Sequence, residues 1–110
     1  QGTRIIDITP IPLEYVVYQN YPNPFNPTTQ IQFGLPDESK IWLTVYDVLG
    51  RQVRSLISSS MEEAGFHSVR WDGRDDAGTP VSAGLYFYQL TARGVNGATF
   101  SKTSKMLLLK

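Results

Sequence analysis

Short segments in which apolar and polar side chains alternate recur along most of the chain, and turn-forming residues separate them. Successive side chains of a β-strand point to opposite faces of its sheet, so this alternation is typical of strands with one buried face. Residues 41–46 and 84–92 show it most clearly. No segment has the apolar spacing of three to four residues that marks an amphipathic helix. The pattern therefore predicts an all-β fold.

Turn-forming residues mark where the expected strands end. Asp47 and Gly50 bound a tight turn in which Gly50 takes a positive φ, and Asn96-Gly97 is a strong hairpin signal. About seven short strands separated in this way predict an immunoglobulin-like antiparallel β-sandwich. The expected strands cover residues 30–34, 41–46, 51–58, 66–71, 84–92 and 99–109, and residues 5–8 are either a first edge strand or part of a linker.

The period of two also assigns side chains to the two faces of the strands. A late strand beginning Gly84-Leu85-Tyr86 predicts a tyrosine corner, in which the Tyr86 hydroxyl bonds back to the preceding loop. We expect the following side chains to face the core: Ile41, Leu43, Val45, Tyr86, Tyr88, Leu90 and Ala92.

Three aromatic side chains, Trp42, Tyr46 and Phe87, fall on the opposite, outer face of these strands. Exposed aromatic rings in a row could stack on sugar rings, as in a carbohydrate-binding module. In a small sandwich such rings more often cover the second sheet or contact a neighbouring domain. Both interpretations stay open from the sequence.

The length of 110 residues suits one domain. We expect residues 1–13, which include Pro10 and Pro12, to be a linker or lead-in from an upstream domain, and residues 14–110 to form the domain. The chain starts at Gln1, with neither an initiator methionine nor a signal peptide. We therefore interpret it as a piece of a longer protein.

Composition excludes several classes of function. Ten basic side chains balance ten acidic ones, which argues against nucleic-acid binding because that requires a basic face. The longest apolar run, residues 106–109, is far shorter than the roughly 18–20 residues of a membrane helix, so no membrane insertion is expected. Cysteine is absent, and the single histidine, His67, has no catalytic partner in any motif. We expect no catalytic site and no cofactor.

An acidic turn cluster covers residues 72–80 (DGRDDAGTP). Asp72, Asp75 and Asp76, together with backbone carbonyls, form a calcium candidate, since calcium takes six to eight oxygen ligands. The spacing differs from that of an EF-hand, which has alternating ligands and a closing glutamate. Turns in which the aspartates bind local N–H groups explain the same residues.

Three prolines in residues 19–29 (QNYPNPFNPTT) disfavour both helix and strand pairing. We interpret this segment as a rigid loop that Tyr21 and Phe25 pin to the core. The functional alternative is a recognition loop for a partner.

Three motifs, taken in order, go beyond composition. They are residues 19–29, residues 45–51 (VYDVLGR), and a set running from residues 71–75 (WDGRD) through 84–90 (GLYFYQL) to 105–110 (KMLLLK). Over residues 13–110 the chain closely resembles the type A C-terminal sorting domain of the type IX (Por) secretion system. Its middle part also resembles the immunoglobulin-like module of the flagellar hook-capping protein.

The resemblance implies a non-catalytic sorting signal. Such domains end large secreted proteins of Bacteroidetes-type bacteria and direct this cargo across the outer membrane to the cell surface or the medium. The implied partners are the outer-membrane translocon, the upstream cargo domain and a sortase-like peptidase. In many members the peptidase removes the domain and joins the cargo to lipopolysaccharide. Cleavage here would fall in or before residues 1–13, and we expect the domain to be a monomer.

The resemblance also assigns recognition residues. One departure from the sorting domains is the longer loop over residues 73–83, which resembles the flagellar version and leaves open a purely structural immunoglobulin-like module. The alternative function is an accessory carbohydrate-binding or structural spacer module of a secreted multidomain enzyme. The recognition residues carried over are Asp47, Gly50, Gly84, Tyr86, Tyr88, Lys105, Met106, Leu107, Leu108, Leu109 and Lys110.

Overall fold

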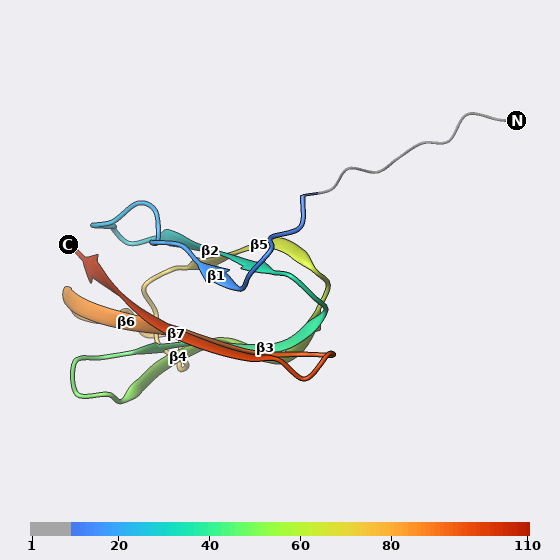
Figure 1. Cartoon of the computed structure of the whole chain (residues 1–110). Coiled ribbons are helices and arrows are strands. Elements are labelled where there is room, and N and C mark those ends of the chain that lie inside the picture. The colour runs from blue at the N-terminus through green and yellow to red at the C-terminus, as the bar shows by residue number, and fades with distance from the viewer. Residues whose placement is uncertain (1–9) are drawn as a thin grey trace, which may run out of the picture.

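The computed structural model describes residues 10–110 and contains seven β-strands (Figure 1). Residues 1–9 lie outside the described part, so the expected lead-in of residues 1–13 and the candidate strand of residues 5–8 stay predictions. Within residues 10–110 no helix is long and apolar enough to cross a membrane. The strands are β1 (Val16–Val17), β2 (Thr29–Leu35), β3 (Ser39–Tyr46), β4 (Gln52–Glu62), β5 (Gly65–Trp71), β6 (Gly84–Gly94) and β7 (Thr99–Leu108).

Two antiparallel sheets face each other and form the sandwich (Figure 1). One sheet has the order β1-β2-β5 and the other the order β4-β3-β6-β7. The chain crosses between the sheets three times, after β2, β4 and β5, whereas β6 and β7 form a hairpin within one sheet. This arrangement confirms the predicted all-β, immunoglobulin-like sandwich.

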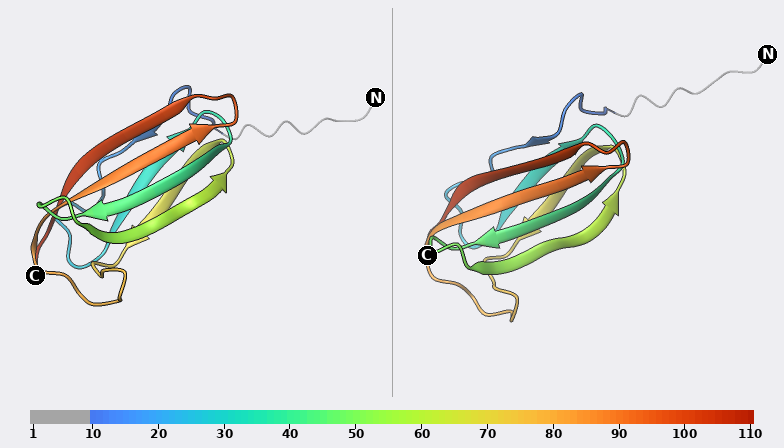
Figure 2. Two further views of the ribbon diagram at one scale, coloured as in Figure 1. Left: turned by 90° about the horizontal axis from the view of Figure 1, so that it is seen from below. Right: turned by 60° about the horizontal axis from the view of Figure 1, so that its bottom comes forward.

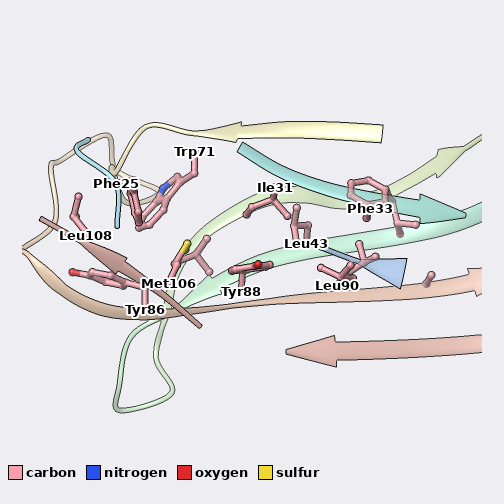
Figure 3. Close-up of a cluster of buried hydrophobic side chains, with 14 of the residues drawn as sticks. Phe25, Ile31, Phe33, Leu43, Trp71, Tyr86, Tyr88, Leu90, Met106 and Leu108 are labelled. Carbon is pink, nitrogen blue, oxygen red and sulfur yellow. The ribbon is translucent and has the colours of Figure 1, made fainter. Parts of the chain in front are cut away.

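The core lies between the sheets and consists of the alternate side chains of each strand (Figure 3). The burial patterns of β3 and β6 repeat every second residue, which confirms the period-two prediction. The side chains predicted to face inward are all buried: Ile41, Leu43, Val45, Tyr86, Tyr88, Leu90 and Ala92.

Strand ends differ from the sequence-based expectation. The strands expected over residues 51–58 and 66–71 are longer, because β4 continues to Glu62 and β5 begins at Gly65. Irregular pairing along β3 explains how β4 becomes this long, since the extra residues of β4 are absorbed in bulges. Ser59, in this stretch, has a φ of 57°. Polar composition alone does not reveal a bulged edge strand.

Residues 47–50 form the tight turn that the sequence predicts. The Gly50 N–H donates to the Asp47 carbonyl over 3.0 Å, and Gly50 has a φ of 79°. A Cβ added at Gly50 would meet no atom within 4 Å, so only the backbone conformation restricts this position.

Replacing Gly50 with valine should therefore lower the free energy of unfolding by about 1–3 kcal/mol, because a β-branched residue is strained at positive φ. Gly50→Asn is the matched control, since asparagine tolerates this region of φ and should cost clearly less. Urea unfolding of the three proteins measures the difference. Equal stability of Gly50→Val and the parent would contradict the assigned turn.

Candidate recognition site

Of the C-terminal residues predicted to carry recognition, residues 105–108 form the end of β7, and Leu109 and Lys110 follow it. Met106 and Leu108 are 1% exposed, and they lie opposite Tyr86 and Gly84 of β6. Lys105, Leu107 and Leu109 alternate with them, and these three residues and Lys110 are accessible to solvent. This segment is therefore a strand with one buried and one accessible side.

The loop over residues 21–27 binds the outer edge of this strand. The Phe25 N–H donates to the Leu107 carbonyl over 3.0 Å, and the Leu109 N–H donates to the Phe25 carbonyl over 2.9 Å. The Asn23 carboxamide oxygen accepts the Leu107 N–H over 3.0 Å. Two motifs that lie 84 residues apart in the sequence thus form one structure at one end of the sandwich. We call residues 21–27 the proline loop.

Phe25 anchors the proline loop in the core. It is 2% exposed, and its ring lies 5.6 Å from the Trp71 ring, which in turn lies 5.5 Å from Tyr86 (Figure 3). The expectation that Tyr21 also pins the loop is wrong, because its side chain is 80% exposed. Both backbone groups of Tyr21 pair with Gln30, so this residue holds the loop through its main chain and leaves its ring outside.

A buried polar network, rather than the Tyr21 ring, helps to hold the proline loop against the core. Asn20 is 2% exposed, and its carboxamide N–H groups donate to the Thr29 hydroxyl over 2.9 Å and to the Pro22 carbonyl over 3.2 Å. The Tyr88 hydroxyl donates to the Tyr18 carbonyl over 2.8 Å and accepts the Asn20 N–H over 2.9 Å. Each buried polar group is paired, which fixes where the loop leaves the sheet.

Tyr86 forms the predicted tyrosine corner. Its hydroxyl donates to the Ser82 carbonyl over 2.6 Å and so ties β6 to the loop before it. Burial raises the pKa of Tyr86 above its usual value, and burial raises the pKa of Tyr88 in the same direction. Both tyrosine rings are buried in the core beneath the candidate site. They stabilise the site and offer little surface to a partner.

The turn of residues 47–50 lies at the same end of the molecule. A shallow cavity of about 360 Å³ has Asp47, Val48, Ser82 and Tyr86 among its lining residues. The Asp47 carboxylate accepts the Arg51 N–H over 3.0 Å, and this bond is the largest cause of a pKa lowered below the usual value. The structure thus brings all the carried-over residues toward one end, and their role in recognition stays a prediction.

The aspartates of the calcium candidate accept hydrogen bonds from backbone N–H groups. Asp75 accepts the N–H groups of Ala77 and Thr79, and Asp76 accepts the Ser55 N–H over 2.9 Å. Asp72 accepts the Arg74 N–H and lies 3.4 Å from an Arg54 guanidinium nitrogen. Among the described residues no group of three acidic, histidine or cysteine side chains is arranged to hold a metal ion. The geometry is that of aspartate turns.

His67 lies on β5, away from this end. Its ring stacks on Phe33 with 5.4 Å between centroids, and Nε2 lies 2.7 Å from the Glu63 carbonyl oxygen. These contacts are those of a packed side chain at a strand end.

A sequence family matches this chain over more than half of its length. The FlgD Ig-like domain pattern covers residues 21–97, from the proline loop through the hairpin after β6. The chain belongs to the FlgD Ig-like domain family. FlgD from P. aeruginosa is similar in structure, with a TM-score of 0.59 and 28% identity over 73% of this chain and 61% of that one.

Two longer proteins contain a region of the same fold as this FlgD Ig-like domain. Dimeric latent PorU from Porphyromonas gingivalis has a TM-score of 0.70 at 19% identity, over 96% of this chain and 10% of PorU. PorZ, a surface component of the type IX secretion system of that organism, has a TM-score of 0.50 at 20% identity, over 87% of this chain and 11% of PorZ. No curated protein sequence matches the chain. At these identities the likeness concerns the fold alone.

Proposed function

We propose that this FlgD Ig-like domain is a non-catalytic sorting signal that directs a larger protein across the outer membrane by type IX secretion. Its motifs resemble those of type A sorting domains, and two proteins of similar local fold are PorU and the secretion-system component PorZ. In this proposal the partners are the outer-membrane translocon and a sortase-like peptidase, and the cargo ends at the cell surface or in the medium.

The observation that carries the proposal is the two-sided tail. Met106 and Leu108 bind the tail into the core, while Leu107, Leu109 and Lys110 leave an accessible apolar and basic strip. The proline loop pairs with the backbone edge of the same residues. A receptor would therefore bind side chains that the folded domain already holds in place, so ordering this tail would cost little entropy on binding.

The placement of the chain ends agrees with such a signal. The first described residues approach the sandwich beside the β6–β7 hairpin, where Glu14 and Tyr15 line a hollow with Asn96, and the C-terminus lies at the opposite end (Figure 2). A cargo attached before residue 10 would then leave the tail accessible. In this proposal the peptidase cleaves in or before residues 1–13, and the described part of this lead-in, residues 10–13, lies at the end opposite the tail.

Export of a reporter tests the proposal. A reporter fused before this domain in a bacterium with type IX secretion should reach the medium or surface. The variant Leu107→Ser/Leu109→Ser/Lys110→Ser should leave most of the reporter in the periplasm, because it removes the accessible strip and keeps Met106 and Leu108. Deleting residues 106–110 should also stop export, but it removes two core side chains as well.

The matched control is Thr99→Ser/Lys102→Ser, on the same strand and also exposed. This variant should be exported like the parent. Urea unfolding of each purified domain shows whether a variant folds. Normal export of a folded Leu107→Ser/Leu109→Ser/Lys110→Ser variant would refute the proposal.

A further inference from the structure

The outer face of the four-stranded sheet is open. Figure 2 shows this sheet in front, with the three-stranded sheet behind it and no other element across it. The alternation of buried and accessible residues identifies the outward side chains of β3, β6 and β7. They are Lys40, Trp42, Thr44, Tyr46, Leu85, Phe87, Gln89, Thr91, Arg93, Thr99, Ser101, Thr103, Lys105 and Leu107.

Charge is distributed unevenly over the described residues. The outward positions of β3, β6 and β7 carry three cations, Lys40, Arg93 and Lys105, and no carboxylate. Lys40 and Arg93 are direct cross-strand partners, a like-charge pair that costs stability. The described carboxylates lie in connecting segments, apart from Glu62 at the end of β4. The outer face of β3, β6 and β7 is therefore cationic in a chain that has no net charge.

Aromatic rings accompany the cations at both ends of this face. The Arg93 guanidinium carbon lies 5.5 Å from the centre of the Trp42 ring, which holds the cation in place. At the other end, Tyr46 and Phe87 line a shallow hollow of about 230 Å³. Asp47 also lines this hollow, and its carboxylate is paired with Arg51 over 2.9 Å.

Hydroxyl and amide groups fill the space between the two ends. Gln89 and Thr103 line the same hollow, and the Thr91 and Ser101 hydroxyls lie 3.5 Å apart. From the Arg93 register to the Phe87 register the face extends about 20 Å, at roughly 3.3 Å per residue. The outward serine, threonine and glutamine residues, six in number, outnumber the three cations. A ligand that matches this face has many hydroxyl groups and few, widely spaced anionic groups.

We propose that the outer face of β3, β6 and β7 binds an acidic polysaccharide. Sugar rings stack on Tyr46 and Phe87, their hydroxyls bond to Gln89 and the neighbouring hydroxyl groups, and carboxylates of the ligand pair with Arg93 and Lys105. A nucleic acid carries a phosphate on every nucleotide and would need a denser array of cations. This binding does not depend on the proposed sorting function.

Titration calorimetry with hyaluronan, which has one carboxylate on every second sugar, tests the proposal, and carboxyl-reduced hyaluronan serves as the neutral ligand of equal backbone. We expect binding to hyaluronan that weakens with salt, and much weaker binding to the reduced polymer. The Arg93→Gln/Lys105→Gln variant should bind about tenfold more weakly or worse, since it loses two charge-assisted contacts. Phe87→Ala should also weaken binding.

Lys102→Gln is the matched control, because Lys102 lies on β7 in register with the buried Leu90 and so belongs to the other face. Its affinity should stay within about twofold of the parent, well below the effect of one charge-assisted contact. The proposal is overturned if hyaluronan does not bind, if the carboxyl-reduced polymer binds equally, or if Lys102→Gln matches the loss in Arg93→Gln/Lys105→Gln. It is equally overturned if poly(U) RNA or phosphatidylglycerol vesicles bind more tightly. Export of the reporter is read separately and bears only on sorting.

Discussion

Replacing Phe25 with alanine should lower the free energy of unfolding by about 3–5 kcal/mol, the cost of removing a fully buried aromatic side chain. Its ring packs on Trp71, and its backbone pairs with Leu107 and Leu109. Loss of the ring therefore removes the anchor that keeps the proline loop against the end of β7. We expect amide protons of residues 107 and 109 to exchange with solvent faster in this variant.

Tyr21→Ala is the control for this prediction, because it truncates another aromatic ring of the proline loop at a site that is 80% exposed. It should change the stability by less than about 0.5 kcal/mol. Urea unfolding followed by tryptophan fluorescence measures both variants. Similar losses for Phe25→Ala and Tyr21→Ala would mean that the loop is anchored in some other way.

Tyr86→Ala should cost about 3–5 kcal/mol, for the same reason of lost aromatic packing and because a cavity remains beside Trp71. The hydroxyl makes a separate contribution. Tyr86→Phe keeps the ring and loses only the bond to the Ser82 carbonyl, so we expect about 1 kcal/mol.

The difference between these two variants separates packing from the tyrosine corner. Thermal and urea unfolding should rank the parent above Tyr86→Phe, and Tyr86→Phe well above Tyr86→Ala. If Tyr86→Phe were as unstable as Tyr86→Ala, the hydroxyl bond rather than the ring would hold the loop before β6. If Tyr86→Phe were as stable as the parent, the hydroxyl bond of the tyrosine corner would add nothing to the stability.

Local patterns were enough to predict the sandwich and its inner faces. Successive side chains of β3 and β6 point to opposite faces of the sheet. Because one face is buried and the other is solvent-exposed, apolar and polar residues alternate in the sequence. The turn at Gly50 and the corner at Tyr86 were predictable for a similar reason, since the residues involved lie within four positions of each other.

Pairing between distant segments left no such local signal. The sequence offers Tyr21 and Phe25 as equal anchors, and only the backbone pairing of Tyr21 with Gln30 decides which ring turns inward. Asn20 looks like a polar loop residue, and its burial depends on Tyr88 and Thr29, which come from two other strands. The position of Asn20 next to the proline-rich motif is the one sequence feature that points to this buried network.

The contact between the proline loop and β7 has a consequence for how the chain is made. Residues 21–27 leave the ribosome early, yet their partners at Leu107 and Leu109 come more than eighty residues later. Until β7 has been synthesised, the Phe25 ring can pack on Trp71, but the Phe25 backbone lacks its partners at Leu107 and Leu109. A domain truncated before that point leaves the proline loop unpaired and accessible to chaperones and proteases. The proline loop can therefore close over β7 only after Leu107 and Leu109 have been translated, so its closure reports that the domain is complete.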